Sequence, residues 1–211
     1  MLGINDIWLF IGSGIVLNIL PGPDSLFVIS RSASQGFKAG SAATLGIGSG
    51  IIVHVLIAAF GLSALLAASS LAFTVVKYLG ALYLLYMAMT LIISRGKPSE
   101  GAVATPLPTP LRVIYRQGFF TNVLNPKVAL FFLAFVPQFI EPESANKALA
   151  FIVLGMIFNC SGMLWCHLLA WTSASASRRL KASGHVSRWL NRAGGALFAY
   201  FGIKLALSSQ I

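Results

Sequence analysis

Long apolar stretches separated by short polar connections make up most of the chain. Each stretch supplies about the 20 apolar residues that a helix needs to cross the hydrocarbon core of a bilayer. Two of them are interrupted, the first at Pro21-Gly22-Pro23-Asp24 and the fourth at Asn125-Pro126-Lys127. The pattern predicts an all-α membrane protein with six transmembrane helices, at about residues 7–30, 41–67, 73–93, 118–139, 148–173 and 189–207.

The composition supports this interpretation. Of the 211 residues, 57% are hydrophobic and 9% are charged, and the formal net charge is +10. Soluble domains carry about 25% charged residues, so the charges here are too few to cover a globule in water. Because the basic residues lie between apolar stretches and not along one helical face, we expect a lipid bilayer as the partner and no nucleic acid.

The basic residues are concentrated in alternate connections between the apolar stretches. By the positive-inside rule these connections are cytoplasmic, and both termini lie on the other side of the membrane. The first residues lack the basic segment of a signal peptide, so we expect the first stretch to be retained as a span. The three connections hold eleven of the 15 lysines and arginines: Arg31, Lys38, Arg95, Lys97, Arg112, Arg116, Arg178, Arg179, Lys181, Arg188 and Arg192.

The two halves of the chain resemble each other. Asn18-Ile19-Leu20-Pro21 matches Asn122-Val123-Leu124-Asn125 at an offset of 104, and Gly80-Ala81-Leu82-Tyr83 matches Gly195-Ala196-Leu197-Phe198 at an offset of 115. The matches predict two three-helix repeats, 1–94 and 112–211, joined by a Pro-rich cytoplasmic linker at 95–111 within one transmembrane domain. With three spans per repeat, the second repeat is inverted, and helices one and four are both broken at mid-membrane. Such inverted repeats are typical of transporters with a central site.

The Pro21-Gly22-Pro23-Asp24 interruption predicts backbone that faces a protein interior or a water-filled cavity. Proline removes a backbone donor and glycine loosens the helix, so the freed polar groups need partners within the hydrocarbon region. Asp24 is the only acidic residue well inside a predicted span. A charge at the bilayer centre costs about 2.5–3.5 kcal/mol, which favours a functional role in binding substrate or a proton. The alternative is a structural kink in which Asp24 caps the second half of the helix.

The Asn125-Pro126-Lys127 interruption is the counterpart in the fourth stretch. Lys127 is the only basic residue well inside a predicted span, where it could pair with Asp24 or attract a carboxylate. The alternative is that Lys127 snorkels to a membrane interface.

Several other polar positions are weaker candidates for substrate binding or coupling. Asn18 and Asn122 lie one turn before each interruption and are expected to face the interior, although Asn18 could equally serve helix packing. His54 in the second span could relay protons, because histidine exchanges them near neutral pH, or could be a packing residue. Asn159 in the fifth span is a similar case. The glycine run at 46–50 predicts close helix contact, not nucleotide binding.

Other classes of function find little support in the residues. Cys160 and Cys166 lie six residues apart in one apolar stretch, on different faces of a helix, so we expect no disulfide, zinc site or redox role. Hydrolysis inside a membrane needs a nucleophile with a base, paired acids or an HExxH motif, so we expect no enzyme. A cation or metal exporter on the same scaffold is the alternative function, although its ligands would have to converge on Asp24.

Several short motifs follow one another along the chain. After Pro21-Gly22-Pro23-Asp24 they are Gly36-Phe37-Lys38-Ala39-Gly40, Leu45-Gly46 with His54, Gly80-Ala81-Leu82-Tyr83-Leu84, Asn122-Val123-Leu124-Asn125-Pro126-Lys127 and Pro137-Gln138-Phe139. Their order and spacing resemble those of the LysE-type amino-acid exporters, within the branch of homoserine, threonine and leucine exporters. The resemblance covers nearly the whole chain.

This resemblance implies a multi-pass protein of a bacterial inner membrane, which would place both termini in the periplasm. It implies export of amino acids or related small zwitterions by proton antiport, with the proton-motive force as energy source and no cofactor. The family's central motifs fall on Pro21, Gly22, Pro23 and Asp24, and on Asn125, Pro126 and Lys127. Faces of small residues would permit a homodimer.

Overall fold

The computed structural model describes residues 2–62 and 109–175 without residue 142, together with single helical residues between 78 and 89 and between 196 and 207. The predicted spans at 73–93 and 189–207, most of the linker at 95–111, and the second pair of matching motifs therefore lie largely outside the described residues. The predicted spans at 7–30, 118–139 and 148–173 fall within them, and the span at 41–67 does so up to residue 62.

The first predicted span is a bent pair of helices. α1 (Ile7–Ile19) and α2 (Pro23–Gln35) meet at an angle of 52°. Leu20 and Gly22 adopt extended backbone between them, and proline stands at the start of α2, where its missing N–H is not needed. The bend therefore coincides with the residues that cannot continue the hydrogen-bond ladder of a helix.

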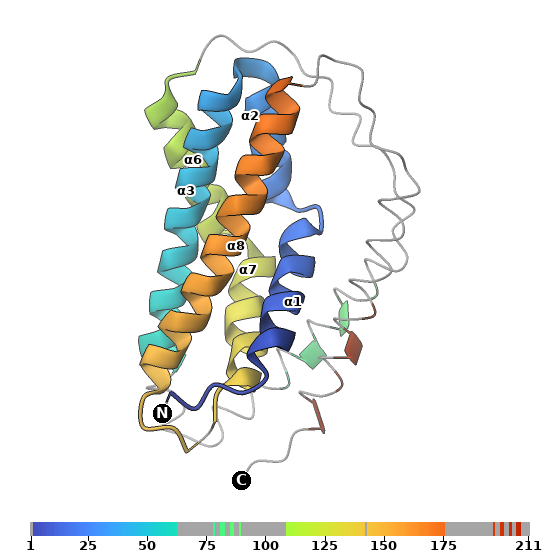
Figure 1. Cartoon of the computed structure of the whole chain (residues 1–211), viewed down its shortest axis with the longest axis vertical. Coiled ribbons are helices and arrows are strands. Elements are labelled where there is room, and N and C mark those ends of the chain that lie inside the picture. The colour runs from blue at the N-terminus through green and yellow to red at the C-terminus, as the bar shows by residue number, and fades with distance from the viewer. Residues whose placement is uncertain are drawn as a thin grey trace.

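A second bent pair forms the fourth predicted span. α6 (Leu111–Val123) ends before Asn125, and the chain resumes as α7 (Pro126–Leu130), the π-helix η2 (Phe131–Phe135) and the 3-10 helix η3 (Val136–Phe139). The two parts meet at 47°. Figure 1 shows that the two bent pairs run in opposite directions and that both bends lie at mid-height of the bundle.

Two long apolar helices accompany the bent pairs. α3 (Phe37–Leu56) continues into the π-helix η1 (Ile57–Leu62), and α8 (Lys147–Ser175) follows the second bent pair. Both are long and apolar enough to cross a membrane, and each bent pair passes the same test as one unit. Apart from one isolated bridge between Ile4 and Ile140, the regular structure of the described ranges is helical.

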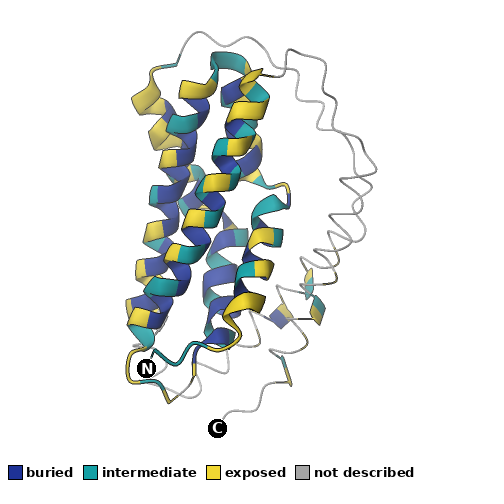
Figure 2. Ribbon diagram, viewed as in Figure 1, coloured by how far each residue is buried: buried dark blue, intermediate teal, exposed yellow. Residues whose placement is uncertain are grey.

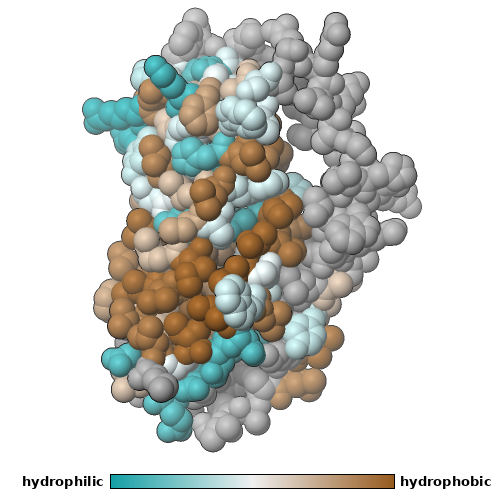
Figure 3. Space-filling model, in the orientation of Figure 1, coloured by the Kyte–Doolittle hydropathy of each residue, from teal (hydrophilic) through white to brown (hydrophobic). Residues whose placement is uncertain are grey.

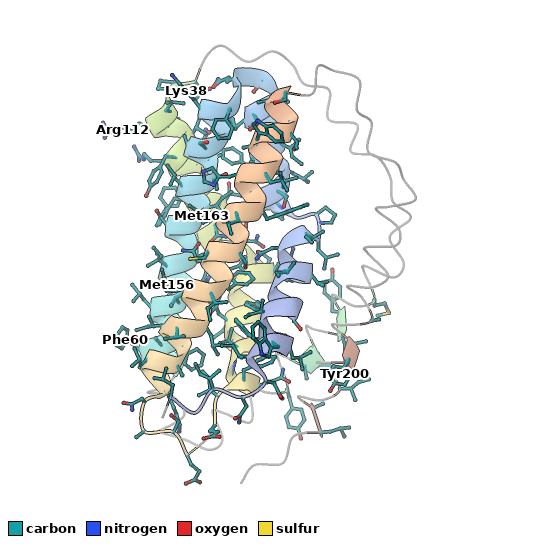
Figure 4. The ribbon with its side chains drawn as sticks, in the orientation of Figure 1. Lys38, Phe60, Arg112, Met156, Met163 and Tyr200 are labelled. Atoms are coloured by element: carbon teal, nitrogen blue, oxygen red, sulfur yellow. The ribbon has the colours of Figure 1, made fainter. Side chains whose placement is uncertain are left out.

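The surface and the core agree with a protein that is immersed in lipid. A broad hydrophobic band covers the lower half of the face in Figure 3, with polar residues at both ends. Lys38 and Arg112 lie at one end of the bundle and Phe60 near the other (Figure 4). The helix faces that are turned toward neighbouring helices are buried (Figure 2), and Phe10 of α1 packs edge-on against Phe139 of η3 at 5.2 Å between ring centroids.

α2 and α6 continue beyond the limits of the predicted spans. α2 continues to Gln35, beyond the predicted end at residue 30, and α6 begins at Leu111, before the predicted start at residue 118. Both limits came from apolar composition alone, whereas the helical ladder continues into turns that carry Arg31, Arg112 and Arg116. Polar turns of this kind belong at the level of the lipid headgroups.

Glycines allow α3 and α6 to approach closely. Gly46 of α3 lies against the carbonyl of Tyr115, and Gly118 of α6 lies against the carbonyl of Ala43. A Cβ added to Gly50 would lie 2.8 Å from Cβ of Asn122. Small residues at such crossings let helices approach within a membrane. The prediction that the glycine run mediates helix contact is therefore confirmed.

This close contact makes Gly118→Ala a test of the α3–α6 packing. The new Cβ would lie 2.5 Å from the carbonyl oxygen of Ala43, so the helices would have to separate. We expect stability to fall by about 1–3 kcal/mol, the usual cost of overpacking. Gly12→Ala is the matched control, because nothing lies within 4 Å of its added Cβ. Thermal unfolding in detergent measures both variants, and equal melting temperatures would contradict the contact.

Candidate functional site

The two bends bring the one intramembrane acid of the first half against the second half. The carboxylate oxygen Oδ2 of Asp24 accepts a hydrogen bond from Nδ2 of Asn122 at 2.8 Å and another from Nδ2 of Asn125 at 3.1 Å. Asn122 is fully buried at the end of α6, and Asn125 is buried at the break itself. The carboxylate thus joins residues that are about a hundred positions apart in the sequence.

Asp24 does not serve as the cap of its own helix. The N-cap of α2 is Gly22, which makes no side-chain cap bond, and Asp24 lies in the first turn. The cap in the second bent pair is Asn125, whose side chain accepts from the backbone N–H of Lys127 at 3.0 Å. Asn125 therefore starts α7 with its oxygen and holds Asp24 with its nitrogen.

Lys127 lies on the backbone of the first bent pair. Its ammonium Nζ donates to the carbonyl oxygens of Leu17 at 2.8 Å and Leu20 at 3.0 Å. Gly22 packs beside it, with an added Cβ 3.5 Å from Nζ. Lys127 therefore does not snorkel to an interface, and among the described residues it forms no ion pair with Asp24 within 4.0 Å. We refer to Asp24, Asn122, Asn125 and Lys127 as the Asp24 site.

His54 contacts the Asp24 site through the backbone of Asn122. Its Nε2 lies 3.0 Å from the carbonyl oxygen of Asn122, and because a carbonyl only accepts, Nε2 carries the hydrogen. The ring stacks on Phe132, with 6.2 Å between centroids. The structure thus places His54 on the α6 break, without a hydrogen bond to Asp24.

The other two candidate asparagines bind α8 and α3. Asn18 donates from Nδ2 to Ser161 Oγ at 3.1 Å, and Asn159 donates to the carbonyl of Gly48 at 3.3 Å. Asn18 and Asp24 border a common cavity, which is described below. Asn159 does not line this cavity, but its partner Gly48 does. The oxygens Oδ1 of Asp24, Asn122 and Asn159 are buried and accept no hydrogen bond from the described residues.

A cavity of about 30 Å³ lies beside Asp24 and Lys127. Met163 on α8, which borders the cavity, lies near mid-height of the bundle (Figure 4). This space is large enough for water and too small for an amino acid. The cavity walls are mostly apolar and include Leu17, Ile47, Ile51, Val128, Phe158, Met163 and Cys166.

A larger hollow of about 630 Å³ lies between α2 and α6. Phe27 and Leu124 line it at the end near the breaks, and Arg31 and Arg116 line it toward the basic end of the bundle. The guanidinium of Arg31 is held by Gln117 at 2.8 Å and lies 5.4 Å from the ring centroid of Phe27. The hollow therefore reaches from two arginines to within one turn of Asp24.

The sequence did not indicate two hydrogen-bond acceptors of the site, the carbonyl oxygens of Leu17 and Leu20, because they are backbone atoms. In a continuous helix the carbonyl of Leu17 would accept from the N–H of residue 21, but residue 21 is proline. The carbonyl of Leu20 would accept from residue 24, across the bend. A carbonyl four residues before a proline is thus the signal that could have indicated where Lys127 binds. In the described ranges no three His, Cys, Asp or Glu side chains converge as a metal site would require.

The sequence has clear relatives among known proteins. The profile of the family described as LysE type translocator matches residues 15–209. An uncharacterized membrane protein of Pseudomonas aeruginosa is 32% identical, over 99% of this chain and 98% of its own length. Proteins named leucine efflux protein are 27% identical in Salmonella typhimurium and 28% in an Enterobacter species, each over 97% of this chain and 96% of their own length. No solved structure matches the chain.

Proposed function

The chain belongs to the LysE type translocator family, and we propose that it exports aliphatic amino acids by proton antiport. The observation that carries this proposal is the position of Asp24. A carboxylate of one bent pair is held by two asparagine amides of the other, beside a small cavity with mostly apolar walls. Substrate and coupling sites between two sets of broken helices are the arrangement of many secondary transporters.

The chemistry of the Asp24 site matches a zwitterion. One oxygen of Asp24, Oδ1, has no hydrogen-bond partner among the described residues and can accept from the ammonium of a substrate or hold a proton. Among the described residues the ammonium of Lys127 uses two of its three N–H groups on carbonyls, and the third can donate to a substrate carboxylate. Apolar side chains around the cavity suit an aliphatic side chain, in line with relatives that are named leucine efflux proteins.

Export requires the site to open to each side in turn. In our proposal the two halves are inverted repeats whose breaks meet at mid-membrane, and rocking of one half against the other widens the cavity toward each side in turn. The opposite directions of the two bent pairs and their bends of 52° and 47° support this proposal. A proton on Asp24 and the substrate ammonium would occupy the same carboxylate in alternate steps, which couples the two fluxes.

We propose that the basic end of the bundle faces the cytoplasm of a bacterium with an inner membrane, and that both termini are periplasmic. Arg31, Lys38, Arg112 and Arg116 lie in the helix ends and connections at that end. Positive charge is retained on the cytoplasmic side during insertion.

In this orientation the hollow between α2 and α6 is the route by which substrate arrives. Arg116 lines it and has no hydrogen-bond or ion-pair partner among the described residues, so it can attract a substrate carboxylate. We expect Arg116→Gln to raise KM about threefold to tenfold at low salt, with unchanged maximal rate. A charge that attracts the substrate carboxylate changes the rate at which substrate and protein associate, and not the later steps. Arg112→Gln, one turn away and outside the hollow, is the matched control. Equal effects of the two variants would contradict the route.

The function is tested in a bacterial host that lacks its own amino-acid exporters. Cells are fed dipeptides that release leucine, isoleucine, valine or methionine, and growth is compared with and without the expressed protein. The proposal predicts protection from at least one aliphatic amino acid and its appearance in the medium. Growth inhibition that the protein leaves unchanged for every dipeptide would refute the proposal.

A further inference from the structure

We propose that the ammonium of Lys127 is a tethered cation in a backbone cation site, and that it makes transport independent of Na⁺. This inference rests on the proposed proton antiport and adds to it the structural reason why Na⁺ does not take part. It concerns the carbonyls of Leu17 and Leu20 at the broken end of α1, which the ammonium occupies at 2.8 and 3.0 Å.

The site has the chemistry of a monovalent cation site. The carbonyl of Leu17 has lost its helical donor to Pro21, and both carbonyls lie at the negative end of the α1 dipole. Carbonyl and carboxylate oxygens are the ligands that hard cations take. In transporters with broken helices, such half-helix ends and unwound carbonyls coordinate the coupling Na⁺.

Here the cation belongs to the other half of the protein. Asn125 fixes the backbone of Lys127 at 3.0 Å and binds Asp24 at 3.1 Å, so one residue joins the tethered cation to the carboxylate. A cation on a covalent stem neutralises the carbonyls, but it cannot cross the membrane. With the ammonium on these carbonyls, the carbonyl site is closed to Na⁺, and the proton of the proposed antiport is carried at Asp24.

The first test uses the unaltered protein in proteoliposomes. Export of a labelled aliphatic amino acid is measured under a proton gradient, with Na⁺ replaced by choline at constant ionic strength. The inference predicts rates that agree within about a factor of two, since no Na⁺ enters the cycle. A requirement for Na⁺ would overturn the inference while leaving export intact. Absence of export in both media would instead refute the proposed function.

The second test opens the carbonyl site and needs no transport. In Lys127→Ala, ethylammonium or Na⁺ should raise the melting temperature by about 2–4 °C in a saturable manner, and choline should not. Wild type and Lys38→Ala, which removes an exposed lysine outside the site, should not respond. Lys127→Met serves in place of the alanine variant if that variant does not fold. A folded variant that neither cation stabilises would overturn the inference, and the Na⁺ test requires neither variant.

Discussion

Asp24→Asn should reduce amino-acid export on the order of 100-fold or more, because losing one partner of a buried charged contact costs about 2–5 kcal/mol. Asparagine has the same shape and still offers an oxygen to Asn122. It can neither take up a proton nor balance a substrate ammonium. Export from loaded proteoliposomes is the measurement that shows the loss.

Folding of the Asp24→Asn variant should be intact. The substitution removes the free-energy cost of burying a charge in the bundle. This gain offsets the stability lost when the hydrogen bond from Asn122 becomes weaker. We therefore expect a symmetrical size-exclusion peak and a melting temperature close to that of the wild type. Asp6→Asn is the matched control, since Asp6 is exposed and has a φ of 50°, which asparagine tolerates. An Asp24→Asn variant that exports at the wild-type rate would contradict the role of the carboxylate.

Asn122→Asp should reduce both stability and export. It replaces the amide that donates to Asp24 at 2.8 Å by a second carboxylate of the same size. Two like charges at such a distance repel each other by several kcal/mol unless they share a proton. The packing of Asn122 on Gly50 is unchanged in size, so the loss reports on charge and not on volume. Thermal unfolding and export are measured on the same preparation.

The double variant Asp24→Asn/Asn122→Asp separates contact from function. It restores one donor facing one carboxylate, so we expect most of the stability lost in Asn122→Asp to return. Export should remain low, because the carboxylate now belongs to the second half and no longer stands at the first turn of α2. A double variant as unstable as Asn122→Asp would contradict the direct contact between the two residues.

The sequence allowed the positions of the bends to be predicted more easily than the contacts between them. Proline and glycine change the backbone locally, so Pro21 to Asp24 and Asn125 to Lys127 stand out in any apolar stretch. The glycine run of α3 was interpretable for the same reason, because its lack of side chains has a direct packing consequence. The helix ends at Gln35 and Leu111 lie outside the predicted spans, because apolar composition indicates burial in lipid and not the extent of the hydrogen-bond ladder.

The partners in the Asp24 site depended on geometry that no pattern contains. Asp24 and Lys127 are the one acid and the one base inside predicted spans, and pairing them was the simplest expectation. Instead Asp24 binds two amides, and the long side chain of Lys127 reaches two backbone carbonyls. Every residue has a carbonyl, so only the three-dimensional course of the break determines which carbonyls lack a donor.

Above all, we propose that an amino acid binds beside Asp24, where the two bent pairs meet. Counterflow of labelled leucine into proteoliposomes preloaded with unlabelled leucine tests it most directly, because exchange needs binding and opening of the site but no net driving force. We expect the wild type to accumulate label, and we expect excess unlabelled aliphatic amino acid to abolish this accumulation. The Asp24→Asn variant should accumulate no label. Equal accumulation by both proteins, or none above empty liposomes for any aliphatic amino acid, would contradict it.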